Sequence, residues 1–373
     1  MDAPGPWGTG PFVLVEGVST LDTERVAVGN DPTAATWLWR GDRTPVVRLV
    51  ANPDYWDTKR GPHLAEVRFR NDLAPDQALD LVCTTEGEVD IVTEVDPADA
   101  ERVEQSEFAQ LVTVDAIRAV AGVINREAAG LPLADPRARQ ALNLAVDRDR
   151  LVREAMFGRA KPLAGLTPAA GILKLDRVLH PFSGPYPHDA ERAAKLWRAA
   201  GGETPRPLRI AAMAKLERVA RRVAEDVREA LGLETEVTVY QGEEEREARR
   251  RLAAKDRPFA WDVFILEHQP QAAEAAALEL HRAFVGATGE YRAGPVVPEF
   301  EERYAALVME TSPLKQAELS HRLDRFVHDE ALALFLCAPE ALYAVNKEVD
   351  FRPYRTTFEL AETRVSERHW SRR

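Results

Sequence analysis

Short apolar runs separated by polar turns dominate the first third of the chain. Residues 46–50 (VVRLV) and 66–70 (EVRFR) show the β-branched content or strict alternation that is typical of half-buried strands. The turn residues Asn52, Pro53 and Asp54 lie between these two runs. The pattern that follows predicts helices at 75–85 and 97–105 and strands at 89–92 and 119–125. This alternation indicates an α/β layer.

A longer helical pattern begins at Asp135. The aspartate is suited to cap a helix, and Pro136 needs no hydrogen-bond partner at the first helical position. Apolar residues then recur at helical spacing, which predicts one helix from about residue 135 to 157 with Gly158 as its C-terminal cap. The side chains expected on its solvated face are Arg139, Asp147, Arg148, Asp149 and Arg150.

The second half alternates between strand and helix patterns. We expect residues 159–187 to be irregular, and the loop 286–298 to be irregular and exposed. The sheet that the strands form should be largely parallel and carry helices on its faces. The expected strands are 208–212, 236–240, 259–266, 332–337 and 342–346, and the expected helices are 188–202, 215–231, 243–255, 272–284, 299–310 and 313–329.

Length and charge bound the class of protein. A chain of 373 residues exceeds the roughly 250 to 300 residues that one core supports, so two lobes are expected. A net charge of -12 disfavours nucleic acid and anionic lipid, and an anionic partner would need a local basic pocket. No apolar run approaches the length of about 18 residues that spans a membrane. Cys83 and Cys337 belong to no metal or redox motif, which indicates buried thiols.

Four segments in a fixed order resemble the family 5 extracellular solute-binding proteins, which bind peptides, nickel complexes and other solutes for ABC importers. The segments are Gly8-Thr9-Gly10-Pro11-Phe12, Asn52-Pro53-Asp54-Tyr55-Trp56, Gly87-Glu88-Val89-Asp90-Ile91 and the run from Asp135 to Arg148. The resemblance implies a two-lobed, periplasmic-binding-protein-like (type II) α/β fold with mixed sheets flanked by helices.

The likeness begins at residue 8, whereas family members carry a signal peptide and further strands before these segments. We therefore expect an incomplete first lobe, formed by residues 1–125 and 346–373, and a second lobe at 126–345 with the ligand cleft between them. The hinge should lie near Asn125 and near 345–350. Localisation is expected to be cytoplasmic if the chain is complete as given, and extracellular or periplasmic if an export signal was removed.

The resemblance also implies a ligand-facing strand at 261–266, followed by Glu267, His268, Gln269 and Pro270. Peptide-binding members carry Asp-Pro in this loop, where the carboxylate suits an α-ammonium group. Gln269 takes that place here, and Glu267 could supply the charge instead. Adjacent strand residues point to opposite sides, so Glu267 and His268 are not expected to form a dyad. The predicted ligand-binding residues are Asn125, Trp261, Glu267, His268, Gln269, Tyr291 and Arg292.

Two aromatic features have alternative interpretations. Tyr291 and Arg292 could stack on and pair with a ligand carboxylate, or they could decorate the surface of an exposed loop. Trp37 and Trp39 fall on one face of a strand, where they could pack in the core or form an apolar wall of the cleft.

The function expected from these observations is binding of a small organic solute, peptide-like or amphipathic, with an ABC permease as a possible partner. The alternative is an intracellular enzyme recruited from this scaffold, such as a cyclase that positions a flexible apolar intermediate; a regulatory module that senses a ligand is a third. No cofactor is expected, and the histidines form no HExxH or similar metal motif. An exposed sheet edge could support a homodimer.

Overall fold

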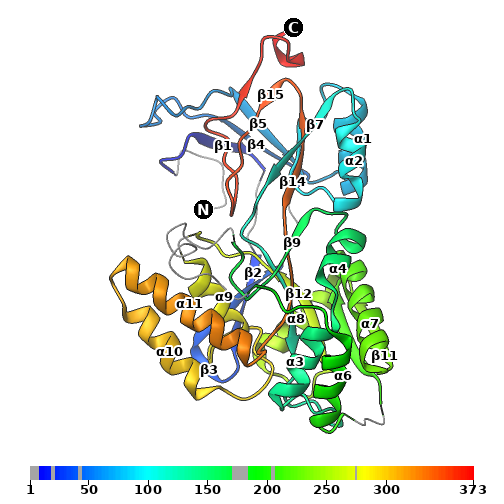
Figure 1. The fold of residues 1–373 in the computed structure, drawn as a ribbon. Coiled ribbons are helices and arrows are strands. Elements are labelled where there is room, and N and C mark those ends of the chain that lie inside the picture. Colours follow the sequence, from blue (N-terminus) through cyan, green and yellow to red (C-terminus); the bar gives the residue numbers. More distant parts are fainter. Residues whose placement is uncertain (1–7, 18–21, 41–43, 170–183, 203–205, 274) are drawn as a thin grey trace. The chain divides into compact units, whose positions relative to one another are not determined.

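The computed structural model describes residues 8–17, 22–40, 44–169, 184–202, 206–273 and 275–373. The described chain packs as two compact units. Unit 1 comprises residues up to Glu24, Trp39–Asp115 and Ala341–Arg373, and unit 2 comprises Arg25–Leu38 and Ala116–Glu340. Each unit contains strands and helices, as the alternating pattern predicted (Figure 1).

The described residues of unit 1 form three small sheets. The antiparallel sheet β1 (Phe12–Glu16), β4 (Val46–Ala51) and β5 (Glu66–Arg70) confirms the two strands expected around the Asn52 turn. A second antiparallel sheet has the order β6 (Ile91–Val92), β14 (Ala341–Asn346), β7 (Ala109–Val114). The third pairs β15 (Val349–Asp350) with β16 (Arg364–Val365), and the chain ends in a 3-10 turn at Trp370–Arg372.

Helices cover one face of the β6-β14-β7 sheet. They are α1 (Pro75–Thr84) and α2 (Ala100–Glu104), the latter after a 3-10 turn at Pro97–Asp99 (Figure 1). Their buried side chains pack against Ala109, Leu342 and Ala344. Because successive strand residues face opposite sides, Gln110 and Val112 of β7 lie on the other face.

The hairpin β2 (Asp22–Val28) and β3 (Asp31–Arg40) forms a two-stranded sheet of its own. Val26 and Leu38 bury their side chains against Ala253 of unit 2. The amide of Gly29 in the hairpin turn donates to the Ala253 carbonyl at 2.9 Å. These contacts explain why the tip of the hairpin belongs to unit 2.

A mixed six-stranded sheet forms the centre of unit 2. Its order is β11 (Thr235–Tyr240), β10 (Leu208–Met213), β12 (Val263–His268), β8 (Ala119–Ile124), β13 (Leu334–Pro339) and β9 (Ala160–Pro162). The β10–β11 and β10–β12 pairs are parallel, and the remaining pairs are antiparallel. The prediction of a largely parallel sheet is therefore correct for one half only. The short strand β9 lies in the segment that was expected to be irregular, of which 170–183 is outside the described residues.

The helices of unit 2 follow the predicted order. They are α3 (Pro136–Ala145), α4 (Arg148–Ala155), α6 (Ala190–Ala199), α7 (Glu217–Leu231, after a 3-10 turn at Ala214–Leu216), α8 (Gly242–Ala254), α9 (Ala276–Phe284), α10 (Pro298–Met309) and α11 (Pro313–Asp329) (Figure 1).

The single helix predicted from Asp135 to about residue 157 is wrong. It is two helices, because Val146 is extended and the Asp147 carboxylate accepts from the Arg150 amide as a second N-cap. The expected solvated face is also wrong for Arg139 and Arg148, which are 3% and 4% exposed.

Both buried arginines bind backbone carbonyls that the helix break and the β13 region present. Arg148 donates to the carbonyls of Phe335 and Asn143, each at 2.8 Å, and Arg139 donates to that of Glu330 at 2.7 Å. Burial lowers the pKa of Arg148 to about 10. The two guanidinium groups therefore tie α3 and α4 to the β13 side of the unit 2 core.

Candidate functional site

The C-terminal end of β12 gathers several charged side chains within unit 2. Glu267 has a side chain that is only 12% exposed, and its Oε1 lies 3.0 Å from Lys215 Nζ and 3.8 Å from Arg118 Nη1. Lys215 follows β10, and Arg118 precedes β8, the two neighbours of β12 in the sheet. One carboxylate thus faces two cations, so the group formed by Glu267, Lys215 and Arg118 carries a net positive charge.

Arg118 has unused hydrogen-bonding capacity. Its side chain is 16% exposed, and its Nε is buried with no hydrogen-bond partner among the described residues. A buried N–H of this kind costs free energy unless an acceptor reaches it. An incoming oxyanion would supply such an acceptor.

His268 lies in a separate hydrogen-bonded chain at the same strand end. Its Nδ1 is 3.1 Å from the Tyr291 hydroxyl, and its Nε2 is 3.1 Å from Oε1 of Glu279 on α9. Because a carboxylate only accepts, Nε2 carries the proton that faces Glu279. Burial would raise the pKa of Glu279, but the hydrogen bonds from His268 and from the Gln271 amide lower it.

The structure brings His268 and Tyr291 together and gives Glu267 different neighbours. Edge-to-face packing of the Tyr291 ring on His268 and on Phe284 fixes the phenol in place. Arg249 of α8 approaches the Tyr291 hydroxyl at 3.4 Å. Burial raises the pKa of Tyr291, so the phenol is a neutral hydrogen-bonding group.

The prediction of an exposed 286–298 loop is wrong around Tyr291, which is 5% exposed. Lys255 explains why the loop folds inward: its ammonium donates to the carbonyls of Gly289 at 2.8 Å, Glu290 at 3.1 Å and Arg292 at 2.9 Å. Arg292 is half-buried and donates to the carbonyls of Gly294 and Ala287 in its own loop. Surface decoration is therefore the wrong interpretation of Tyr291.

Asn125 and Trp261 lie at the opposite end of the β8–β12 pair from Glu267. Asn125 is 7% exposed, and its side-chain amide donates to the Trp261 carbonyl at 3.3 Å. Trp261 is 4% exposed and stacks on Phe259. Gln269 follows β12 and is half-buried. The predicted residues therefore do not form one cluster within unit 2.

Trp37 on β3 is 58% exposed, so the core-packing interpretation is wrong for this residue. The side chain of Trp39 is outside those that the structure describes. Whether either indole forms an apolar wall of a ligand site stays a prediction.

Sequence reasoning missed Lys215, Arg118 and Glu279. A signal for Lys215 was present, because the carboxyl ends of parallel strands meet at one edge of a sheet, and Lys215 follows β10 as Glu267 ends β12. Arg118 could be placed only once the antiparallel pairing of β12 with β8 was known, and Glu279 only once the packing of α9 was known.

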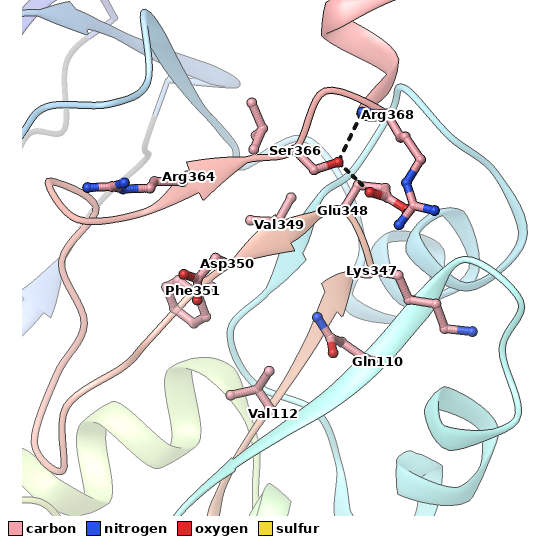
Figure 2. Close-up of a pocket in the computed structure, with 11 residues that line it drawn as sticks. Gln110, Val112, Lys347, Glu348, Val349, Asp350, Phe351, Arg364, Ser366 and Arg368 are labelled. Atoms are coloured by element: carbon pink, nitrogen blue, oxygen red, sulfur yellow. Dashed lines mark hydrogen bonds and ion pairs between the residues drawn. The ribbon is translucent and has the colours of Figure 1, made fainter.

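Unit 1 holds a pocket of about 520 Å³ on the β7 face opposite α1 and α2 (Figure 2). Val112, Val349 and Phe351 supply apolar surface. At one end Glu348 accepts from the Ser366 hydroxyl and pairs with Arg368 at 3.3 Å. The Ser366 hydrogen bond lowers the pKa of Glu348, so this carboxylate is charged. The pocket combines a small apolar wall with a mixed-charge rim.

Both cysteines are free and buried, which confirms the prediction of buried thiols. Among the described ranges, no group of three or more histidine, cysteine, aspartate or glutamate side chains is arranged to hold a metal ion. None of the helices in the described part of the chain is both long and apolar enough to cross a membrane.

Comparison with known proteins relates this geometry to solute-binding proteins. The family model described as "Bacterial extracellular solute-binding proteins, family 5 Middle" matches residues 2–271. A probable di/tripeptide-binding protein 5 from Pseudomonas aeruginosa is 30% identical over 157 residues, which is 42% of this chain and 28% of that protein.

Solved structures share the fold at low identity. The ABC transporter substrate-binding protein CtaP from Listeria monocytogenes superposes with a TM-score of 0.71 at 16% identity, covering 96% of this chain and 67% of that chain. NikA from Brucella suis, in complex with Fe(III)-EDTA, superposes with a TM-score of 0.72 at 18% identity, covering 96% of this chain and 68% of that chain. The α/β fold is therefore that of the two-lobed periplasmic binding proteins, as predicted, and the chain spans about two thirds of these structures. The chain belongs to the bacterial extracellular solute-binding proteins of family 5.

Proposed function

We propose that this chain binds a small peptide-like solute as the substrate-binding component of an ABC importer, and that residues at the end of β12 contact the solute. The observation that carries this proposal is the family match over residues 2–271. The likeness to a probable di/tripeptide-binding protein supports a di- or tripeptide as the ligand.

The charges at the end of β12 favour a carboxylate as the group bound there. Lys215 and Arg118 share the single carboxylate of Glu267, which holds both cations in place and leaves one positive charge uncompensated. Gln269, at the place where the resemblance to peptide-binding members implies an aspartate, adds no negative charge. We therefore expect the ligand's carboxylate, rather than its α-ammonium group, to lie against Arg118 and Lys215.

Isothermal titration calorimetry with Ala-Ala and Ala-Ala-Ala tests this function. We expect saturable binding that weakens about tenfold or more when the terminal carboxylate is replaced by an amide, because a charge-assisted hydrogen bond is lost. Arg118→Met should weaken binding of the free acid to a similar extent. Glu302→Gln, at an exposed position on α10, is the matched control and should bind as the wild type does.

Native mass spectrometry of the purified protein extends the test to solutes outside that panel. A co-purifying peptide would support the proposal directly. Absence of binding by every di- and tripeptide tested, together with a co-purified ligand of another class, would contradict the peptide assignment. Equal affinity for acid and amide would leave peptide binding intact and remove Arg118 and Lys215 from the site.

A further inference from the structure

A second pocket in unit 1, of about 410 Å³, is lined only by polar and charged side chains. It lies between the segment 57–63 and the C-terminal segment 350–364. The lining residues are Lys59, Arg60, His63, Asp350, Arg352, Glu362 and Arg364. Four cations face two carboxylates in a chain whose net charge is -12. We propose that this pocket binds a small multivalent oxyanion, a phosphate or a polycarboxylate.

The two carboxylates of the pocket are already paired. Asp350 binds the Arg352 guanidinium through two contacts of 3.0 Å, and Glu362 accepts from Arg60 at 3.1 Å. These pairs occupy Arg352 and Arg60, and Arg60 is shared with Glu359, which lies outside the pocket lining. The cations that remain are Lys59 and Arg364, and within the described part of the chain neither has a carboxylate oxygen within the 4.0 Å of an ion pair.

Arg364 keeps its full charge available for a ligand. Its Nη2 lies 2.9 Å from Nε2 of His63, and because a guanidinium only donates, the imidazole nitrogen accepts this hydrogen bond. Figure 2 shows the Arg364 side chain extending away from Lys347, at the edge that the larger pocket shares with this one. A guanidinium has five N–H donors in a planar fork, which matches two oxygens of an oxyanion.

Backbone packing holds the two walls of the pocket together. A Cβ at Gly61 would lie 2.0 Å from the Ala361 carbonyl oxygen, so only glycine allows this approach of the two segments. Arg60 spans the same junction, donating to the Tyr354 hydroxyl at 2.8 Å and pairing with Glu359 at 3.4 Å. The backbone of the two walls therefore needs no ordering when an anion binds.

The composition of the walls selects the class of ligand. A pocket without apolar side chains offers no surface for an apolar solute, whereas excess cations around fixed ion pairs favour a compact, highly charged anion. All the lining residues belong to unit 1, and none of them is among the proposed peptide contacts on β12.

Calorimetric titration of the full chain with inorganic phosphate and with citrate, at low ionic strength, tests the proposal. We expect one saturable site for at least one of the two anions, with affinity reduced about tenfold or more in Arg364→Met and in Lys59→Met. Tighter binding of citrate would identify a polycarboxylate ligand, and tighter binding of phosphate would identify a phosphate. Arg68→Met is the matched control, because it removes an exposed arginine of unit 1 that does not line the pocket, and it should leave the affinity unchanged.

Two results would overturn the proposal: no saturable binding of either anion, or unchanged affinity in both variants. Circular dichroism checks that each variant folds. If Arg364→Met does not fold, the affinity of Lys59→Met still tests the proposal. The Ala-Ala titration is run on the same variants. Retained peptide binding with lost anion binding separates this site from the β12 site, so each proposal can fail alone.

Discussion

Asp262 is a fully buried carboxylate whose charge two arginines balance. Its oxygens lie 2.7 Å from Arg206 Nη1 and 2.9 Å from Arg209 Nη2. Burial would raise the pKa of Asp262, but the hydrogen bonds from the two arginines lower it. We expect Asp262→Asn to reduce the free energy of unfolding by about 3 kcal/mol, because it leaves the arginines without their counter-charge.

Urea denaturation of Asp262→Asn measures this loss. Glu318→Gln, which breaks the exposed Glu318–Arg322 pair on α11, is the control and should change stability by less than about 1 kcal/mol. Equal effects of the two substitutions would show that the buried pair contributes no more than a surface one.

His281 provides a pH-dependent contribution at the residue scale. Its ring is fully buried, with Nε2 3.2 Å from Asp324 Oδ1 and Nδ1 2.7 Å from the Ala277 carbonyl. Burial would lower the pKa of His281, but attraction to Asp324 outweighs it and raises the pKa above the ordinary value. The native state therefore binds the proton more tightly than the unfolded chain, so this stabilisation is complete below the unfolded pKa of about 6.5 and is lost as the pH rises through the folded pKa.

We accordingly expect the stability difference between wild type and His281→Gln to be larger at about pH 5.5 than at about pH 9. Chemical denaturation at the two pH values measures it, with His321→Gln on α11 as the control histidine substitution. A difference that grows with pH would show that His281 is neutral in the native state.

At the scale of elements, Asp147 separates α3 from α4. Its carboxylate accepts from the Arg150 amide at 2.9 Å, and its own amide donates to Asp226. We expect Asp147→Ala to lower the free energy of unfolding by about 1 kcal/mol through loss of the N-cap. Asp149→Ala changes an exposed residue in the first turn of α4, two residues after the cap. It should cost less, because it loses only an interaction with the helix dipole. Thermal and urea denaturation compare the two, and a larger loss for Asp149→Ala would contradict the capping role.

At the scale of the whole molecule, ligand binding should stabilise the folded chain by mass action. A dipeptide at about 100 times its Kd adds about 2.7 kcal/mol, which raises the Tm of a chain of this length by about 3 °C. Differential scanning calorimetry with Ala-Ala measures the shift. Arg118→Met should show a smaller shift at the same peptide concentration, and an identical shift in both proteins would place the ligand away from Arg118.

Local patterns accounted for most of the elements and for the family. The Asn52 turn, the Asp135-Pro136 helix start and the alternation from β10 to β12 are short-range signals, because capping and side-chain periodicity depend on neighbouring residues. They failed at Asp147, where two capping signals lie within one apolar pattern. They also failed at Arg148, because its partner on β13, the Phe335 carbonyl, is distant in sequence.

The sequence by itself determined the α/β class, the order of the elements in unit 2 and membership of the solute-binding family, since these rest on local patterning and ordered motifs. Only the tertiary structure decided which charges meet. Glu267 is balanced by Lys215 and Arg118, Tyr291 is buried against His268, and Arg364 remains without a carboxylate among the described residues. The physical reason is that electrostatic pairing and burial depend on distances in space, which join residues from strands and loops far apart along the chain.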